Sequence, residues 1–438
     1  MRLPTLARRV SGHITDLRQD RFFRRLAMLS GGVAAGQLFL ALSTPLLTRL
    51  YTPEDFGVFA VIIAILAMFN SVSSMRLETS LPVCRPETLV TGLATTLSLA
   101  VCTVALLTLG IAVTEFFLLP PTVGPELRKA LWVVPIAALL GALALPLVYL
   151  RIRRGDFRTY GLARLTRLVS QGSGQIVFGF AGMTQLGLPL GYALGPGASL
   201  FLLLRGAGAE MQQIMRVELR QVGAYIREHW RHPLYMMPAA ILYEAVQFLP
   251  AVLLAAVFSP AAAGFFTLSQ RVLGLPVRFL SQSAGQVLLG EASEASRGEL
   301  SRRVRVIVRQ FFFLGILIIL PMVLIGSDGW EFLFGERWGK AWTFVFALSP
   351  MYLLRFVTET ISNMFIITNT QHFRFASSVA LFAITLSSFL AAPYLGLGPV
   401  AATVLYSLGC SIVYAAQLLV ILSLSDSYGK PSEPSAKS

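Results

Sequence analysis

Charged residues are scarce in this chain. Only 13% of its 438 residues are charged, against roughly 25% in an ordinary soluble domain, whereas 55% are hydrophobic. A chain with so little charge cannot cover a surface that faces water. Apolar segments of about 20 residues recur along the whole length, and each is long enough to cross a hydrocarbon core of roughly 30 Å. The composition therefore excludes a soluble globular domain and predicts an all-α membrane protein, because a helix satisfies its own backbone groups in lipid.

Cysteine and histidine are also rare, and this limits disulfide and metal chemistry. The three cysteines are Cys84, Cys102 and Cys410, and two of them fall inside apolar segments, which argues against a disulfide framework. His229 and His232 are three residues apart, a spacing that a metal site could use. Without a third ligand nearby, such a pair is more often plain polar surface. We therefore expect neither a bound metal nor a cofactor.

About twelve membrane spans are predicted from the apolar runs. They lie near 26–47, 56–75, 89–113, 131–150, 162–180, 186–204, 235–257, 262–289, 311–327, 341–367, 375–392 and 397–422. The expected organisation is a basic segment (1–25), a six-helix lobe (26–204), an amphipathic linker (205–234), a second six-helix lobe (235–422) and a polar tail (423–438). The N-terminal segment, the linker and the tail are expected on the cytoplasmic side.

The distribution of Lys and Arg sets the expected orientation. With a cytoplasmic N-terminus, 28 of the 36 basic residues fall on the cytoplasmic side. The opposite loops hold only Arg49, Arg128, Lys129, Arg337 and Lys340. Short cytoplasmic loops carry such an excess of positive charge. The bias predicts that both termini are cytoplasmic.

Two dense basic clusters could be binding patches for nucleic acid, because the net charge of the chain is +14. They comprise Arg151, Arg153, Arg154 and Arg158, and Arg302, Arg303, Arg305 and Arg309. Nucleic acid is one partner of such patches. Each cluster here abuts a predicted span, and attraction to anionic lipid head groups explains it. We therefore expect membrane lipids, and no nucleic acid, as partners.

An internal repeat relates the two halves. The sequence Thr52-Pro53, three residues, then Gly57 recurs 207 positions later as Ser259-Pro260, three residues, then Gly264. Six spans separate the two copies, and an even number restores the same orientation. The repeat predicts two parallel six-helix lobes around a central cavity. The alternative is that each copy is a generic helix–loop–helix junction.

Small residues and tryptophans indicate packing and interfacial positions. Glycines recur every four residues in the first predicted span (Gly32, Gly36) and the sixth (Gly187, Gly191, Gly195), a spacing typical of close helix packing. The loop after the ninth span carries Trp330, Trp338 and Trp342, which are typical of an interfacial belt. None of these residues is assigned to a substrate.

Five charged residues lie well inside the predicted spans, all in the second half: Glu244, Arg271, Arg278, Arg355 and Glu359. A charge at mid-bilayer costs at least about 2.5–3.5 kcal/mol, so each needs a reason. Counting outwards from the turn near Pro260 places Glu244 between Arg271 and Arg278 in depth, so two guanidinium groups could bracket one carboxylate. Arg355 and Glu359 are four apart and can pair within their own helix.

Arg271 and Arg278 favour an anionic cargo. A guanidinium stays charged and binds two phosphate oxygens at once, so it suits a lipid diphosphate better than a cationic drug. The same arginines could instead hold helix to helix. No motif for catalysis rises above background. The sequence therefore predicts a transporter and not an enzyme.

Several stretches together resemble one family. They are Thr44-Pro45, Arg49-Leu50-Tyr51-Thr52-Pro53-Glu54-Asp55-Phe56-Gly57, Arg76-Leu77-Glu78 with Leu81-Pro82, and Gln270-Arg271-Val272-Leu273-Gly274-Leu275-Pro276. They resemble bacterial polysaccharide biosynthesis proteins of the oligosaccharide flippase family, in the multidrug/oligosaccharidyl-lipid/polysaccharide exporter (MOP) superfamily. The resemblance implies two six-helix lobes around a cavity that opens alternately to each side, with Glu244, Arg271 and Arg278 on its wall.

The resemblance also implies a cargo and a place. The expected cargo is an undecaprenyl-diphosphate-linked oligosaccharide, an anionic lipid moved across the bacterial inner membrane for O-antigen (lipopolysaccharide), capsule or exopolysaccharide synthesis. The polysaccharide polymerase and chain-length machinery of the same pathway are expected partners. Two rivals remain. One is an ion-coupled exporter of small molecules, with Glu244 as ion relay; the other is a membrane polysaccharide polymerase or ligase, which would need a large reactive outer loop.

Overall fold

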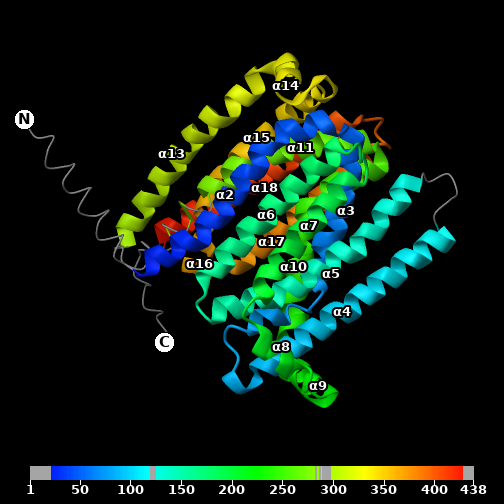
Figure 1. Cartoon of the computed structure of the whole chain (residues 1–438). Coiled ribbons are helices and arrows are strands. Elements are labelled where there is room, and N and C mark those ends of the chain that lie inside the picture. Colours follow the sequence, from blue (N-terminus) through cyan, green and yellow to red (C-terminus); the bar gives the residue numbers. More distant parts are fainter. Residues whose placement is uncertain (1–20, 119–124, 282–283, 286–287, 289–296, 428–438) are drawn as a thin grey trace, which may run out of the picture. The chain divides into compact units, whose positions relative to one another are not determined.

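The computed structural model describes residues 21–118, 125–281, 284–285, 288 and 297–427. Every regular element in these ranges is a helix (Figure 1). The prediction of an all-α membrane protein is confirmed. The predicted segments 1–25 and 423–438 fall largely outside the described residues.

The long helices coincide with the predicted spans. They are α2 (Arg21–Leu50), α3 (Pro53–Val72), α4 (Leu89–Val113), α5 (Pro125–Arg153), α6 (Phe157–Phe180), α7 (Gly187–Leu204), α10 (Met237–Val257), α11 (Pro260–Pro276), α13 (Arg297–Leu324), α15 (Ala341–Ile361), α17 (Gln371–Ala391) and α18 (Pro399–Ser427). Ten helices in the described ranges are long and apolar enough to cross a membrane. The other two predicted spans correspond to α6, which carries Arg158, Arg164 and Arg167, and to α11, which is 17 residues long. The count of twelve crossings stays a prediction.

The chain divides into two compact units. Unit 1 contains residues 1–43 and 69–238, and unit 2 contains 44–68 and 239–438. The halves therefore separate near the predicted linker, while the α2–α3 turn groups with the second half. The lobe boundaries drawn from the sequence stay a prediction.

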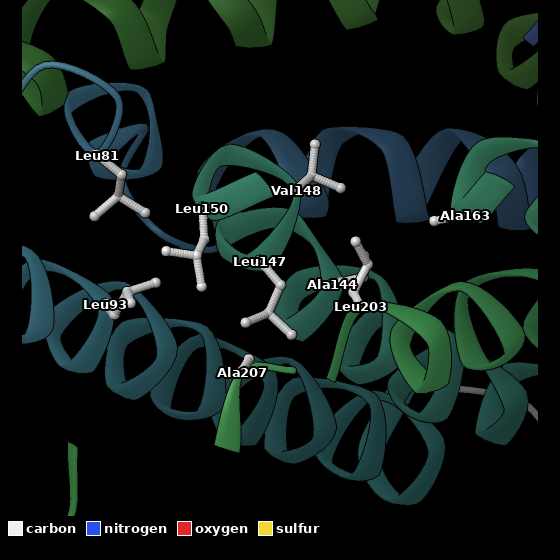
Figure 2. Packing of buried hydrophobic residues seen from close by; sticks show 9 residues of the cluster. All are labelled: Leu81, Leu93, Ala144, Leu147, Val148, Leu150, Ala163, Leu203 and Ala207. Atoms are coloured by element: carbon white, nitrogen blue, oxygen red, sulfur yellow. The ribbon is translucent and has the colours of Figure 1, made fainter. Parts of the chain in front are cut away.

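Unit 1 is held together by close helix packing. Its core gathers apolar side chains from α4, α5, α6 and α7 around Leu147 (Figure 2). The predicted small-residue contacts are present: Gly191 packs against the backbone of Gln175, and Gly32 packs against that of Gly161. A β-carbon at either glycine would overlap the facing helix, so the glycines set how closely these helices approach.

The arginines at the end of α5 cap backbone carbonyls. Arg151 is buried and donates to the carbonyl oxygens of Leu203, at 2.8 Å, and of Arg205. Arg153 donates to those of Leu81 and Cys84, at 2.6 and 2.7 Å. The two guanidinium groups thus donate to carbonyl oxygens at helix and loop ends that would otherwise lack a hydrogen-bond donor. Two of the arginines that the sequence assigns to lipid head groups are thus used inside the protein.

Asp156 connects Arg151 to the start of α6. Its carboxylate accepts hydrogen bonds from the Thr159 backbone amide, at 3.1 Å, and from Arg151, at 3.2 Å. Burial alone would raise the pKa of Asp156, but these hydrogen bonds and the Arg151 charge outweigh it and lower the pKa. Asp156 therefore caps α6 as a carboxylate.

The predicted linker forms short helices with one buried side. They are α8 (Gly208–Ile214) and α9 (Leu219–Glu228), followed by the π-helical turn η4 (His232–Met236). Tyr225 is the buried residue of α9, and its hydroxyl lies 2.7 Å from that of Ser80. Leu219, at the start of α9, is 88% exposed. That the linker is an interfacial amphipathic helix stays a prediction.

Unit 2 is organised around α15, which packs against α11, α13 and α18. Two of the loop tryptophans are buried beside it, which differs from the predicted interfacial belt. Trp338 is 0% exposed, donates to the Thr48 carbonyl at 2.7 Å and packs edge-on against Phe56. Trp330, in α14 (Gly326–Phe334), is 2% exposed and donates to the Met322 carbonyl. Hydropathy cannot distinguish a tryptophan that faces lipid from one buried between helices.

The two copies of the repeat meet inside unit 2. The first copy forms the α2–α3 turn and the second forms the α10–α11 turn, where the Ser259 hydroxyl accepts from the Ala262 amide and caps α11. Gly57 lies against the carbonyl group of Pro260, and Gly264 lies against that of Pro53. Each copy's glycine thus packs against the proline carbonyl group of the other copy. Such an exchange is expected of a true repeat and not of two unrelated junctions.

Candidate functional site

Arg355 is the predicted intramembrane charge with the best-defined surroundings. It lies in the second half of α15, and its Nη2 donates to the Gln247 side-chain oxygen at 3.0 Å. Its guanidinium carbon lies 5.7 Å from the centroid of the Tyr352 ring. The Nε atom is buried and has no hydrogen-bond partner among the described residues. The Nε–H group of Arg355 therefore remains available to a further hydrogen-bond acceptor.

Tyrosines surround this guanidinium. Tyr352 on α15 and Tyr406 and Tyr414 on α18 are buried, and all three act on Arg355 electrostatically, as does Glu359. The Thr358 hydroxyl donates to the Tyr414 backbone carbonyl at 3.3 Å, which fixes α15 against α18. One aromatic face and one amide thus contact a cation that the membrane would otherwise penalise.

Gln247 links this cluster to Glu244. The two residues are three apart on α10 and share one side of the helix. Because Gln247 reaches Arg355, the side of α10 that carries Glu244 is turned towards α15. Glu244 is partly buried and is not without a partner. The Gln247–Arg355 hydrogen bond therefore joins α10 to α15, a contact that the sequence does not predict.

Arg271 occupies a different side of α11. The Ser269 hydroxyl donates to the Ala341 carbonyl at 3.1 Å, so the side of α11 that carries Ser269 faces α15. Arg271 follows two residues later, about 200° around the helix, and so points away from α15. It too is engaged in an interaction.

The expected bracket of Glu244 by Arg271 and Arg278 requires α10 and α11 to pack along each other. In the described residues α11 packs along α15. Arg278 falls in the π-helical turn η5 (Val277–Ser281), and its side chain lies outside the described part of the chain. The bracket stays a prediction.

Arg355 and Glu359 occupy successive turns of α15, as predicted, but the hydrogen bond of Arg355 goes to Gln247. Gln247 and the tyrosines were not among the site residues predicted from the sequence. One signal was present: Tyr406, Cys410 and Tyr414 recur every four residues and line one side of α18. Their relation to Arg355 depends on which helices pack together, which the chain order does not reveal.

The histidine pair lies beside the buried tyrosine of the linker. The His229 ring stacks on Tyr225, with centroids 4.2 Å apart, and its Nδ1 lies 3.1 Å from the Tyr225 backbone oxygen. Within the described ranges, His, Cys, Asp and Glu form no group of three or more that could hold a metal ion. All three cysteines are free.

The fold is similar to those of several solved structures. Lipid II flippase MurJ in an inward closed conformation aligns with a TM-score of 0.68 at 12% identity, over 90% of this chain and 86% of that one. A MATE transporter in complex with MaD5 aligns at 0.58 and 15% identity, over 95% and 98%. An inward-facing multidrug resistance MATE family transporter of the MOP superfamily aligns at 0.55 and 12%, over 91% and 96%. No match was found among curated proteins.

The helical fold is similar to that of a lipid II flippase and of MATE transporters. A sequence model described as polysaccharide biosynthesis protein matches residues 46–343, more than half of the chain. The chain belongs to that family.

Proposed function

We propose that the protein moves an undecaprenyl-diphosphate-linked oligosaccharide repeat unit across the bacterial inner membrane by alternating access. The product would supply O-antigen, capsule or exopolysaccharide synthesis. Two comparisons support the proposal. The family is one of polysaccharide biosynthesis, and the lipid II flippase, which shares the fold, is named for a lipid-linked cargo.

One observation carries the choice of an anionic cargo. Arg355 lies in a membrane-spanning helix, and its Nε is buried without a hydrogen-bond acceptor in the described residues, while neutral Gln247 and tyrosines surround its other atoms. A guanidinium held this way is ready to take a further acceptor. A diphosphate bears about two negative charges, and a cationic wall offsets the cost of moving it from water.

The roles of the individual charges follow from this proposal. Arg271 and Arg278 hold the diphosphate, and Glu244 balances the arginines in the empty site. Arg355 and Glu359 form the secondary charge set, in which Gln247 keeps the guanidinium oriented. The sugars travel through the polar cavity and the lipid tail stays in the bilayer.

The experiment is a deletion strain of the source bacterium. We expect a lipid-linked glycan to accumulate in the inner leaflet, and a plasmid copy of the gene to clear it. A double Arg271→Ala, Arg278→Ala variant that inserts normally should not clear it. If the deletion leaves all lipid-linked glycans at their normal level, the proposed cargo is wrong; if the double variant transports normally, the site assignment is wrong.

The likeness to MATE transporters keeps one rival, an ion-coupled exporter of small molecules. In that case Glu244 would relay a proton or sodium ion. Transport of a soluble cation that stops when the ion gradient is collapsed, and that is lost in Glu244→Gln, would favour the exporter. Undiminished glycan transfer without an ion gradient would favour the flippase.

The proposed setting is the bacterial inner membrane, with both termini in the cytoplasm and with polysaccharide polymerase and chain-length machinery as partners. The structural neighbours are a flippase and transporters, and we propose no enzymatic step. Reporter fusions at each terminus test the orientation: activity of a cytoplasmic reporter at both ends is expected.

A further inference from the structure

The short helix α14 is fixed to the end of α13 by tryptophan N–H groups. The buried Trp330 donates from its indole nitrogen to the Met322 carbonyl oxygen at 3.0 Å. The indole nitrogen of Trp342 donates to the Val323 carbonyl oxygen at 2.7 Å. Both carbonyl groups lie in the last turn of α13, where the helix itself supplies no donor. The Trp330 ring also stacks on Phe334, with centroids 4.7 Å apart. One side of α14 is therefore occupied by packing within unit 2.

The remaining surface of α14 divides into a polar flank and an apolar flank. With about 100° between successive residues of a helix, Ser327 and Glu331 lie together on one flank, and both are exposed. Phe332 and Leu333 lie on the other flank, and both are exposed, Phe332 by 80%. Ile325 precedes the helix directly, lies on the same flank as Phe332 and is exposed as well. The helix thus has three sides, of which one is packed, one is polar and one is apolar and uncovered in the described residues.

The apolar flank of α14 continues the exposed apolar side of α13. The segment Leu300–Leu324 of α13 is long and apolar enough to cross a membrane. Exposed apolar side chains recur along it at every third or fourth position, a spacing that places them on one side of the helix. They are Phe313, Leu317, Leu320 and Leu324. In a membrane this side of α13 faces the acyl chains. Because Leu324 directly precedes Ile325, the lipid-facing side of α13 passes directly onto the apolar flank of α14.

Contacts on its other sides tie α14 to both copies of the internal repeat. The Arg49 guanidinium, at the end of α2, donates to the Phe332 backbone carbonyl at 3.3 Å. Trp338 follows α14 by four residues, and its ring packs edge-on against Phe56 of α3 and Phe265 of α11, with centroids 4.9 and 5.9 Å away. These two phenylalanines belong to the first turns of the two repeat copies. The depth at which α14 lies in the membrane therefore sets the depth of both turns.

We propose that α14 is an interfacial membrane anchor, whose apolar flank of Ile325, Phe332 and Leu333 inserts into the boundary between acyl chains and head groups. The leaflet is the one at this end of α13, predicted to face away from the cytoplasm. Ser327 and Glu331 stay in water, as on the polar side of helices that lie in the plane of the interface. Lipid is the occupant because the flank is continuous with the lipid-facing side of α13. The proposal does not depend on the identity of the cargo.

The test is site-directed spin labelling of the full-length protein in liposomes of phosphatidylethanolamine and phosphatidylglycerol. Cys84→Ser and Cys102→Ala remove the two native cysteines that a reagent can reach, while Cys410 is buried and stays. A nitroxide is then attached at one introduced cysteine at a time. Its collisions are measured with oxygen, which concentrates among acyl chains because it is apolar, and with a neutral nickel chelate, which stays in water.

We expect the ratio of oxygen to nickel collisions to be several-fold higher in Phe332→Cys than in Glu331→Cys, the matched control on the polar flank. Leu317→Cys, on the lipid-facing side of α13, should give a ratio at least as high as that of Phe332→Cys. If Phe332→Cys does not insert, Leu333→Cys on the same flank should show the same preference for oxygen. Equal ratios on the two flanks overturn the anchor, because α14 would then lie in water. A nitroxide on the apolar flank that is shielded from both reagents also overturns it, because protein, such as a second copy of this chain, would then cover the flank.

Discussion

Gly57 and Gly264 occupy equivalent positions in two helical turns, and each packs against the proline carbonyl group of the other turn. A β-carbon on Gly57 would lie 2.6 Å from the carbonyl carbon of Pro260, and one on Gly264 would lie 2.7 Å from that of Pro53. Only glycine permits two backbones to approach this closely. The internal repeat therefore has a structural purpose, since its copies form one reciprocal contact.

Gly57→Ala and Gly264→Ala should each destabilise this contact. The added methyl group must displace backbone, and overpacking of this kind costs about 1–3 kcal/mol. Thermal unfolding of the purified protein in detergent measures the loss. Gly110→Ala is the control, because nothing lies within 4 Å of a β-carbon there, and it should be neutral or slightly stabilising. Equal stability of all three variants would contradict the close approach.

The positions of the helices could be predicted well from the sequence, for a physical reason. A span is a local property of hydropathy and length, so α4 was expected at 89–113 and is found at Leu89–Val113. The equivalent positions of Pro53 and Pro260 predicted a repeat, but the contact between its two turns was not predicted. Burial of Trp338 was not foreseeable, because its partner is the carbonyl of Thr48, 290 residues away.

The candidate site was predicted only in part. Arg355 stood out because a charge within an apolar run needs a reason. Its hydrogen bond to Gln247 could not be predicted, because Gln247 is uncharged and lies 108 residues away. Arg151 and Arg153 were misinterpreted for a similar reason: a run of arginines looks the same whether it meets lipid phosphates or the protein's own carbonyl groups.

Arg151→Gln should lower the free energy of unfolding by about 2–3 kcal/mol. The change leaves the Leu203 and Arg205 carbonyls without their charged donor in a buried position. Arg158→Gln, in the same basic cluster but exposed, should change it by less than about 0.5 kcal/mol. Thermal unfolding compares them directly, and equal effects would return Arg151 to a lipid-facing role.

Tyr225→Phe should weaken the docking of α9 by about 1 kcal/mol, because it removes the hydrogen bond to Ser80 while preserving the stacking on His229. Limited proteolysis within 205–234 should become faster. Tyr243→Phe, at a 56% exposed tyrosine, is the control and should leave the cleavage rate unchanged. An unchanged rate in Tyr225→Phe would show that the hydroxyl contact does not hold the helix.

The same tyrosine predicts a dependence of stability on pH. Burial raises the pKa of Tyr225 to about 12, above the unfolded value of about 10. Its contribution is therefore complete below about pH 10 and is lost as the pH rises from about 10 to about 12. The stability difference between wild type and Tyr225→Phe should shrink over that range. A difference that stays constant to pH 12 would contradict burial of a neutral phenol.

Arg355→Gln should reduce glycan transfer at least about tenfold without loss of folded protein, because it removes the guanidinium that the tyrosines surround. Gln247→Ala should cause a smaller loss, since it frees the guanidinium without removing it. The exposed Arg374 supplies the control Arg374→Gln, which should transport normally. Full transfer by Arg355→Gln would exclude this guanidinium from the pathway of the cargo.

Reconstitution is the sharpest test of the proposed transport of a lipid-linked oligosaccharide across a membrane. Proteoliposomes would be loaded with an undecaprenyl-diphosphate-linked oligosaccharide, and its exposure to an external glycosidase would be followed over time. The account predicts that the wild-type protein renders the inner-leaflet half of the substrate cleavable, and that Arg355→Gln slows this conversion. Cleavage that stops at the outer half, as in protein-free liposomes, while a small cation is exported by the same preparation, would contradict it.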